Sequence, residues 1–243
     1  INAIVLSGGS AYGLAASDGV MRCLEEHGIG FETGYAKVPL VCQSCIYDLG
    51  YGSATVRPDS EMGYAACEKA LAGGNPSSGS VGAGTGATVG KICGMERAMK
   101  SGLGMYAVQL GELRMAAVVE VNALGDIFDS STGRKIAGLR TEDGTAFSDS
   151  CEELWKMGQR ENLFTGNTTI GAVITNGKFN KAQMNKIASM TRNAYARCIN
   201  PVGTMADGDS IYAASAGEVE ADLNVAGTLA TYVMERAIVA AIR

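Results

Sequence analysis

Asn167, Thr168 and Thr169 stand directly before an apolar run, 170–174, and their types could support nucleophilic chemistry. A threonine hydroxyl is a weak nucleophile unless a base lies beside it. The nearest base for Thr168 is its own α-amino group, with an ordinary pKa of about 7.7–8.0, and a cut before Thr168 would free it. Gly166 permits unusual dihedrals, so the Asn167–Thr168 bond could be held bent. We expect the Thr168 hydroxyl to attack the Asn167 carbonyl, giving an ester that water opens and leaving Thr168 as an N-terminal nucleophile.

Three other polar residues could assist such a nucleophile. Asn122 interrupts the apolar segment "AAVVEVNALG", where a polar amide is costly unless it is hydrogen-bonded. It is either a satisfied structural amide or a donor to an oxyanion. Asp207 and Asp209 flank Gly208 just before the apolar run "SIYAASA", and they form either a plain surface turn or a pair of carboxylates that orient and tune the hydroxyl. Calcium is not indicated, because no EF-hand spacing follows.

The glycine-rich segment 75–94, "NPSSGSVGAGTGATVGKICG", delivers one lysine, Lys91. Its spacing does not fit a phosphate-binding loop, because Gly86 stands four residues before Gly90 and Ile92 occupies the magnesium-binding hydroxyl position. "GAGTGA" satisfies a looser dinucleotide pattern, but no strand-turn-helix pattern surrounds it, so nucleotide binding is a weak alternative. We interpret the glycines as backbone that must pack closely against another part of the protein, with Lys91 delivered into that contact.

The cysteines and the single histidine do not indicate a metal or redox centre. Seven cysteines are an odd number without a disulfide framework, which favours free thiols in a reducing compartment and a cytoplasmic location. Cys42 and Cys45 form an isolated CxxC pair. His27 stands at a predicted helix end beside Gly28, where a cation is favourable. We therefore expect chemistry from hydroxyls, amines, amides and carboxylates, with no metal and no organic cofactor.

The composition excludes several classes of protein. A formal net charge of −5 and a pI near 5.0 argue against a nucleic-acid partner, which would require a basic face. No apolar run reaches the ~18 residues that a membrane span requires, so no membrane contact is expected. With 47% apolar residues and 33 glycines, the 243-residue chain fits a globular protein with many tight turns.

The elements that must position these residues alternate without a regular βαβ pattern. A first strand breaks at Gly8-Gly9, and Ser10 is expected to cap a helix over 11–28 that places Leu14, Val20 and Leu24 on one face. Further helices are predicted over 59–71, near Trp155, over 180–200 and over 219–243. Strands are predicted over 105–110, 115–128, 168–176 and 210–216, and 129–165 is expected to be a surface excursion. These patterns favour one layered α+β domain over 1–243.

Five stretches together resemble one enzyme family. They are "LSGGSAYGLAASDGVMRCLEEHGIGF", "VRPDSEMGYAAC", "GAGTGATVGK", "NTTIGAVITN" and "GTMADGDSIYA", in that order over nearly the whole chain. They are similar to the DmpA-type self-processing aminopeptidases, which include L-aminopeptidase/D-esterases, β-peptidyl aminopeptidases and nylon-oligomer hydrolases (peptidase family S58). The resemblance implies a four-layer αββα sandwich, cleavage into an α part, 1–167, and a β part, 168–243, and a homo-oligomer of four processed protomers.

The resemblance also implies roles for individual residues. Thr168 matches the nucleophile, Asn167 the residue released before it, and Asn122 the amide near the oxyanion. Lys91, Asp207 and Asp209 match the supporting residues of the nylon-hydrolase type, whereas other members carry Ser and Glu at the two aspartate positions. The family's N-terminal segment ahead of "NAIVLSGG" is not in this sequence.

The predicted function is thus hydrolysis of a small peptide, amide or ester at its N-terminal amino acid. No stretch of the sequence decides whether the acyl group is an L-, D-, β- or ω-amino acid. Three alternatives stay open, namely an acyltransferase that resembles ornithine acetyltransferase, an unprocessed binding protein in which Thr168 only starts a strand, and the weak alternative of nucleotide binding.

Overall fold

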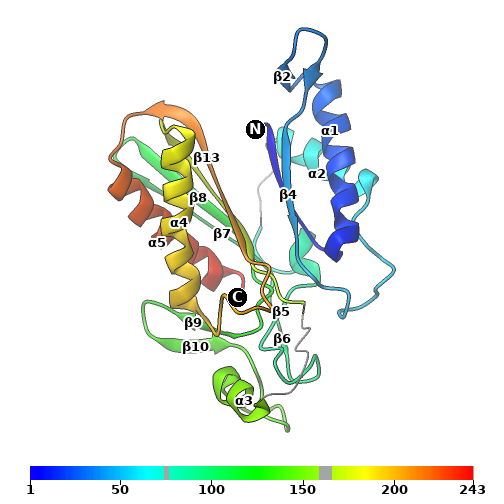
Figure 1. The fold of residues 1–243 in the computed structure, drawn as a ribbon, viewed down its shortest axis with the longest axis vertical. Helices are drawn as coiled ribbons and strands as arrows, with labels where there is room; N and C mark the ends of the chain where they lie inside the picture. Colours follow the sequence, from blue (N-terminus) through cyan, green and yellow to red (C-terminus); the bar gives the residue numbers. More distant parts are fainter. Residues whose placement is uncertain (74–76, 159–165, 243) are drawn as a thin grey trace.

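A computed structural model of the chain describes residues 1–73, 77–158 and 166–242, arranged in four layers (Figure 1). Two helices cover a small parallel sheet, which faces a larger mixed sheet, and two further helices cover the far side of that larger sheet. This is the αββα sandwich that the resemblance implied, and the α+β class is confirmed.

The first half of the sandwich is built from β1 (Ala3–Ser7) and β4 (Val41–Cys45), which pair in parallel. α1 (Ala16–Glu26) and α2 (Ser60–Leu71) cover them. Alternate residues of β1 face this helical layer, where Val5 packs against a buried cluster of α1 and α2 that includes Val20 and Cys23. Leu6 faces the other way, into the space between the two sheets.

The second half holds the four-stranded sheet, in the order β13 (Ser210–Val219), β11 (Ile170–Gly177), β8 (Leu113–Glu120) and β7 (Leu103–Leu110). β11 and β13 run parallel, since α4 (Lys181–Cys198) connects them, and the other pairs are antiparallel. α4 and α5 (Leu223–Ala240) pack on one face of this sheet, over the apolar alternate residues of β8.

The two sheets meet through a small apolar cluster and a polar contact. Ile170 at the head of β11 packs with Ile46, Ala87 and Leu6. The Ser44 hydroxyl of β4 lies 2.7 Å from the Tyr212 hydroxyl of β13. The start of β11 is therefore fixed between the layers, beside the end of β4.

Shorter elements gather at the end of the sandwich where β11 begins (Figure 1). They are η1 (Ser10–Ala15), η2 (Gly82–Thr85), β5 (Thr88–Val89), β6 (Met99–Lys100), β9 (Asp126–Asp129), β10 (Arg134–Ala137), α3 (Ser150–Met157) and β12 (Ile199–Asn200). The hairpin of β2 (Phe31–Glu32) and β3 (Lys37–Val38) lies beyond the other end of α1.

Several predicted boundaries were wrong. Ser10 does not cap a helix, because Gly9 and Ser10 adopt left-handed backbone angles (φ 83° and 55°) and a 3₁₀ turn precedes α1. Leu14 belongs to that turn and is 54% exposed, so it does not share the buried face of Val20. The predicted strand 115–128 divides into β8 and β9, with the chain leaving the sheet at 121–125.

Other predictions hold within the described residues. The helices expected over 59–71, near Trp155, over 180–200 and over 219–243 correspond to α2, α3, α4 and α5. Residues 159–165, the last part of the predicted surface excursion, lie outside the described residues, as do 74–76 of the glycine-rich segment. Among the described helices, none is both long and apolar enough to span a bilayer.

Candidate active site

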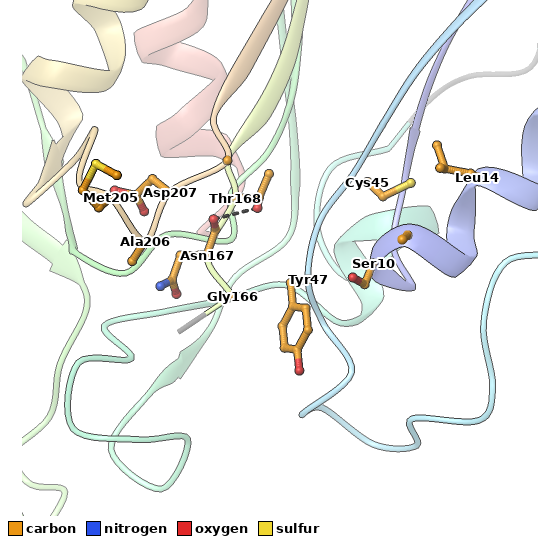
Figure 2. Close-up of a pocket in the computed structure, with 12 residues that line it drawn as sticks. Ser10, Leu14, Cys45, Tyr47, Gly166, Asn167, Thr168, Met205, Ala206 and Asp207 are labelled. Atoms are coloured by element: carbon orange, nitrogen blue, oxygen red, sulfur yellow. Dashed lines mark hydrogen bonds between the residues drawn. The ribbon is translucent and has the colours of Figure 1, made fainter. Parts of the chain in front are cut away.

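A cavity of about 510 Å³ lies at the head of β11, between the two halves of the sandwich (Figure 2). One wall comes from η1 and the end of β4, with Ser10, Leu14, Cys45 and Tyr47. The other wall comes from residues 166–168 and 205–208, which lead into β11 and β13. The sequence-predicted junction between Asn167 and Thr168 therefore lines a cavity of substrate size.

Three hydrogen bonds hold this junction. The Thr168 hydroxyl donates to the carbonyl oxygen of Asn167 at 2.6 Å (Figure 2). The Gly208 N–H donates to the same oxygen at 2.9 Å. The Thr168 N–H donates to the carbonyl oxygen of Asn122 at 3.0 Å. The hydroxyl thus touches the carbonyl group of its own peptide bond, and a backbone donor is aimed at the oxygen on which charge would develop during attack.

The parallel pairing of β11 and β13 creates this arrangement. Before the first paired residues, Ile170 and Ser210, the two segments of the chain stay side by side. The Ser210 N–H donates to the Thr169 carbonyl oxygen, and Asn167 and Asp207 form an isolated parallel bridge. A Cβ at position 208 would lie 3.0 Å from the Thr168 Oγ1 atom, tighter than ordinary contact. Glycine at 208 therefore lets the backbone donor approach the nucleophile.

Lys91 is buried beside the junction, with 7% of its surface exposed. Its ammonium donates to the Asn122 side-chain oxygen at 2.8 Å and to the Asn122 carbonyl oxygen at 3.2 Å. Burial lowers the Lys91 pKa to about 7, although the charges of Asp207 and Asp48 oppose that shift. Lys91 and the Thr168 N–H thus share the Asn122 carbonyl oxygen as acceptor. The lowered pKa allows Lys91 to be a neutral amine near neutral pH.

Asn122 is fully buried and its amide is engaged on both sides. Its Oδ1 atom accepts from Lys91 and from the Thr88 N–H at 3.2 Å, and its Nδ2 donates to the Tyr47 carbonyl oxygen at 2.9 Å. The side-chain amide is therefore hydrogen-bonded as a structural amide would be. The backbone carbonyl of Asn122 also orients Thr168. Donation by the Asn122 amide to an oxyanion remains a prediction, because the N–H that contacts the Asn167 carbonyl oxygen belongs to Gly208.

The two aspartates flank the nucleophile and are not a plain surface turn. Asp209 Oδ1 accepts from the Thr169 N–H at 2.7 Å. Burial raises the Asp209 pKa to about 6, and the nearby charge of Asp207 adds to this, while the Thr169 bond and Arg192 lower it. Asp207 Oδ2 accepts from the N–H and hydroxyl of Thr204, both at 2.8 Å, which fixes the loop before Gly208.

Sequence reasoning missed one acidic residue, Asp48. It lines a second cavity of about 170 Å³ together with Lys91 and Tyr51, and this cavity shares Gly166 and Asn167 with the first one. Asp48 accepts from the Gly9 N–H at 2.7 Å, and a Cβ at either Gly8 or Gly86 would lie 2.3 Å from its carboxylate. The sequence signal was the pair of glycine-rich turns, but only the fold shows that they enclose Asp48.

The CxxC pair supplies no metal site in the part of the chain that the structure describes. Cys45 lines the larger cavity, and its thiol accepts from the Ser7 hydroxyl at 3.1 Å. Burial raises the Cys45 pKa. All seven cysteines are free, and the group of possible metal ligands among the described residues lies elsewhere, on α1 and α2.

Comparisons with known proteins identify the family of this chain. The family model for Peptidase family S58 matches residues 1–243. The chain is 37% identical over 229 residues to an uncharacterized aminopeptidase of Mycobacterium leprae, covering 91% of this chain and 61% of that protein. It is 34% identical over 226 residues to a 6-aminohexanoate-oligomer endohydrolase of a Kocuria species, covering 90% of this chain and 61% of that enzyme. The chain thus spans about three-fifths of the length of these relatives.

Two solved structures share the fold. The PH0078 protein of Pyrococcus horikoshii superposes with a TM-score of 0.62 at 19% identity, covering 98% of this chain and 64% of that one. The L-aminopeptidase D-Ala-esterase/amidase of Ochrobactrum anthropi, described as a variant of the Ntn hydrolase fold, gives a TM-score of 0.57 at 18% identity, covering 96% and 63%. With a family match along all 243 residues and relatives above 30% identity, this chain belongs to peptidase family S58.

Proposed function

We propose that this chain is a self-processing amide hydrolase of the aminopeptidase type, with Thr168 as its nucleophile. The observation that carries the proposal is the contact of 2.6 Å between the Thr168 hydroxyl and the Asn167 carbonyl oxygen, an oxygen that the Gly208 N–H also binds. The names of relatives, an aminopeptidase and a 6-aminohexanoate-oligomer endohydrolase, support an amide bond as the substrate.

Processing begins when the Thr168 oxygen attacks the Asn167 carbonyl carbon and the Thr168 nitrogen leaves. The hydroxyl proton passes to that nitrogen, and neutral Lys91, with its pKa near 7, is the basic group of the site that can assist the transfer. Water then opens the ester. The products are a carboxylate on Asn167 and a free α-amine on Thr168.

Turnover repeats this chemistry on an external amide. The α-amine of Thr168, ordered by the Asn122 carbonyl, takes the proton of its own hydroxyl as the hydroxyl attacks the substrate carbonyl. The Gly208 N–H stabilises the oxyanion, with a second donor from the Asn122 amide, and one such donor contributes on the order of 3 kcal/mol. Asp209 fixes the backbone after Thr168 through the Thr169 N–H, and Asp207 with Lys91 sets the charge of the site.

The substrate amine has a partner of opposite charge once the chain is cut. Gly166 and Asn167 separate the larger cavity from the smaller one that Asp48 and Lys91 line. Withdrawal of the new C-terminus joins the two cavities, so that an acyl group on Thr168 can extend toward the Asp48 carboxylate. An ammonium at the end of that acyl group would pair with Asp48, which is the requirement of an aminopeptidase.

The experiment compares the full-length protein with Thr168→Ala and Thr168→Ser on aminoacyl p-nitroanilides and 6-aminohexanoate oligomers. Thr168→Ala should be inactive and Thr168→Ser should keep activity at a lower rate. Thr169→Val is the matched control, because the neighbouring hydroxyl is buried and makes no hydrogen bond to the described residues. Full activity of Thr168→Ala would refute the proposal.

The same assay separates hydrolysis from acyl transfer. With an added amine acceptor, a hydrolase releases the free amino acid, whereas an acyltransferase forms the acylated amine. We further propose a homo-oligomer of four processed protomers, which light scattering of the purified protein can test, and a cytoplasmic location, which cell fractionation can test.

A further inference from the structure

Three possible metal ligands converge on the outer helical layer. Cys23 lies on α1, His27 directly follows the end of that helix, and Glu68 of α2 completes the group. One ligand atom from each lies within 4.8 Å of the others. His27 is the single histidine of the chain, and the proposed hydrolysis uses none of these residues.

The distances within this cluster fit a tetrahedral zinc ion. The Cys23 sulfur lies 3.4 Å from Glu68 Oε1, and His27 Nε2 lies 3.5 Å from the same oxygen. With metal bonds of about 2.3 Å to sulfur and about 2.0–2.2 Å to nitrogen and oxygen, tetrahedral geometry separates ligand atoms by about 3.4–3.6 Å. Both atoms that face Glu68 Oε1 are therefore already spaced from it as ligands of one ion, and the Cys23 sulfur lies 4.0 Å from the His27 ring at Nδ1.

The histidine is already oriented as a ligand. His27 Nδ1 lies 2.9 Å from the Cys23 carbonyl oxygen, and because that oxygen can only accept, Nδ1 carries the proton. The other ring nitrogen, Nε2, faces Glu68. Zinc-bound histidines commonly donate their second N–H to a backbone carbonyl in this way.

The cluster combines a buried thiol with access from solvent. Cys23 is fully buried, in one apolar cluster with Val20, Leu24 and Cys67. The side chains of His27 and Glu68 are 44% and 46% exposed, which leaves a path for an ion from outside.

The geometry points to a zinc site formed by Cys23, His27 and Glu68 that clamps α1 to α2, with its fourth position open to solvent. Thiolate, imidazole and carboxylate together favour zinc over magnesium or calcium. The site lies toward the C-terminal ends of both helices, whereas the active-site wall from η1 lies before the N-terminal end of α1. The ion would hold the helical layer together and take no part in hydrolysis.

The test uses the reduced full-length protein, stripped with a chelator, incubated with Zn²⁺ and passed through a desalting column. Elemental analysis should find one zinc per chain in the wild type and in the control Cys42→Ser, a cysteine outside the cluster. His27→Asn and Glu68→Gln, both at exposed positions, should each weaken zinc binding by about 10–100-fold. Circular dichroism verifies that every variant is folded.

Cobalt distinguishes coordination by Cys23 from adventitious surface binding. Co²⁺ should produce a thiolate charge-transfer band in the wild type and in Cys42→Ser, and the band should weaken in Cys23→Ser. Added zinc should raise the melting temperature of the wild type and not that of His27→Asn. Equal zinc content in the wild type and His27→Asn, or folded wild type that retains no zinc, would overturn the assignment.

Discussion

Replacement of Lys91 by methionine tests whether the active-site lysine is neutral near physiological pH. Lys91 is buried, and its pKa falls from the ordinary value of 10.5 to about 7 because the charged form loses its hydration. Methionine has a similar length and no charge. In the Thr168→Ala background both proteins should stay uncut, so that their unfolding can be compared.

The sign and size of the expected change in the free energy of unfolding follow from proton linkage. Between pH 7 and pH 10.5 the unfolded chain keeps the Lys91 proton and the folded chain does not, so the free energy of unfolding increases with pH. The slope is about 1.4 kcal/mol per pH unit, and the gain from pH 7 to pH 9 is about 2 kcal/mol, because the folded lysine is still half protonated at pH 7. The methionine variant lacks this gain. Its free energy of unfolding relative to that of the lysine protein should therefore decrease by about 2 kcal/mol between pH 7 and pH 9.

The assay is urea unfolding followed by far-ultraviolet circular dichroism at pH 7, 8 and 9 for both proteins. Other titrating groups are shared, so they cancel in the difference between the two stabilities. Parallel stabilities across the three pH values would mean that Lys91 keeps its proton in the folded protein. The role of Lys91 as a base in processing would then be refuted.

Three further predictions concern the neighbours of the nucleophile. Gly208→Ala places a Cβ 3.0 Å from the Thr168 Oγ1 atom and should slow processing at least about 10-fold, measured as the half-time of cleavage on gels; an unchanged half-time would remove the Gly208 N–H from the mechanism. Asp209→Asn should reduce turnover about 100-fold with the fold kept, and the rate of the wild type should decrease below about pH 6 as this carboxylate gains its proton. If the Asp209→Asn variant turned over substrate at the wild-type rate, Asp209 would have no part in the mechanism. Asp48→Asn should raise KM for substrates with a free amine and not for N-acetylated ones, and equal effects on both would contradict the pairing.

Local signals made several elements predictable from the sequence. Asp59 caps α2 by accepting from the Met62 N–H, and Asn180 with Gln183 forms a capping box at the start of α4. These interactions are complete within four residues, so the sequence alone reveals them. The apolar segment before Asn122 likewise indicated a strand, and it contains most of β8.

Other features depend on contacts between distant segments. The left-handed turn at Gly9 and Ser10 approaches Pro58 and Arg57, which no local pattern could show, and a capped helix was predicted there instead. Asp48 acquires its place because two glycine-rich turns far apart in the sequence close around it.

The candidate site could be predicted from the sequence only in part. Thr168 was identified from the hydroxyl at a strand head, but its contact with Gly208 arises because β11 and β13 pair in parallel across α4. The resemblance to self-processing aminopeptidases brought Lys91, Asn122 and the two aspartates together before any geometry did. It did not show that the backbone carbonyl of Asn122 accepts from the Thr168 N–H.

The intact masses of fully active protein, measured under denaturing conditions, test the central claim most directly. Cleavage before Thr168 predicts two polypeptides, one ending at Asn167 and one of 76 residues from Thr168 to Arg243. Thr168→Ala should give a single polypeptide. A single uncut mass in material that hydrolyses amides at the full rate would contradict the account, because no α-amine would then be available to activate the Thr168 hydroxyl.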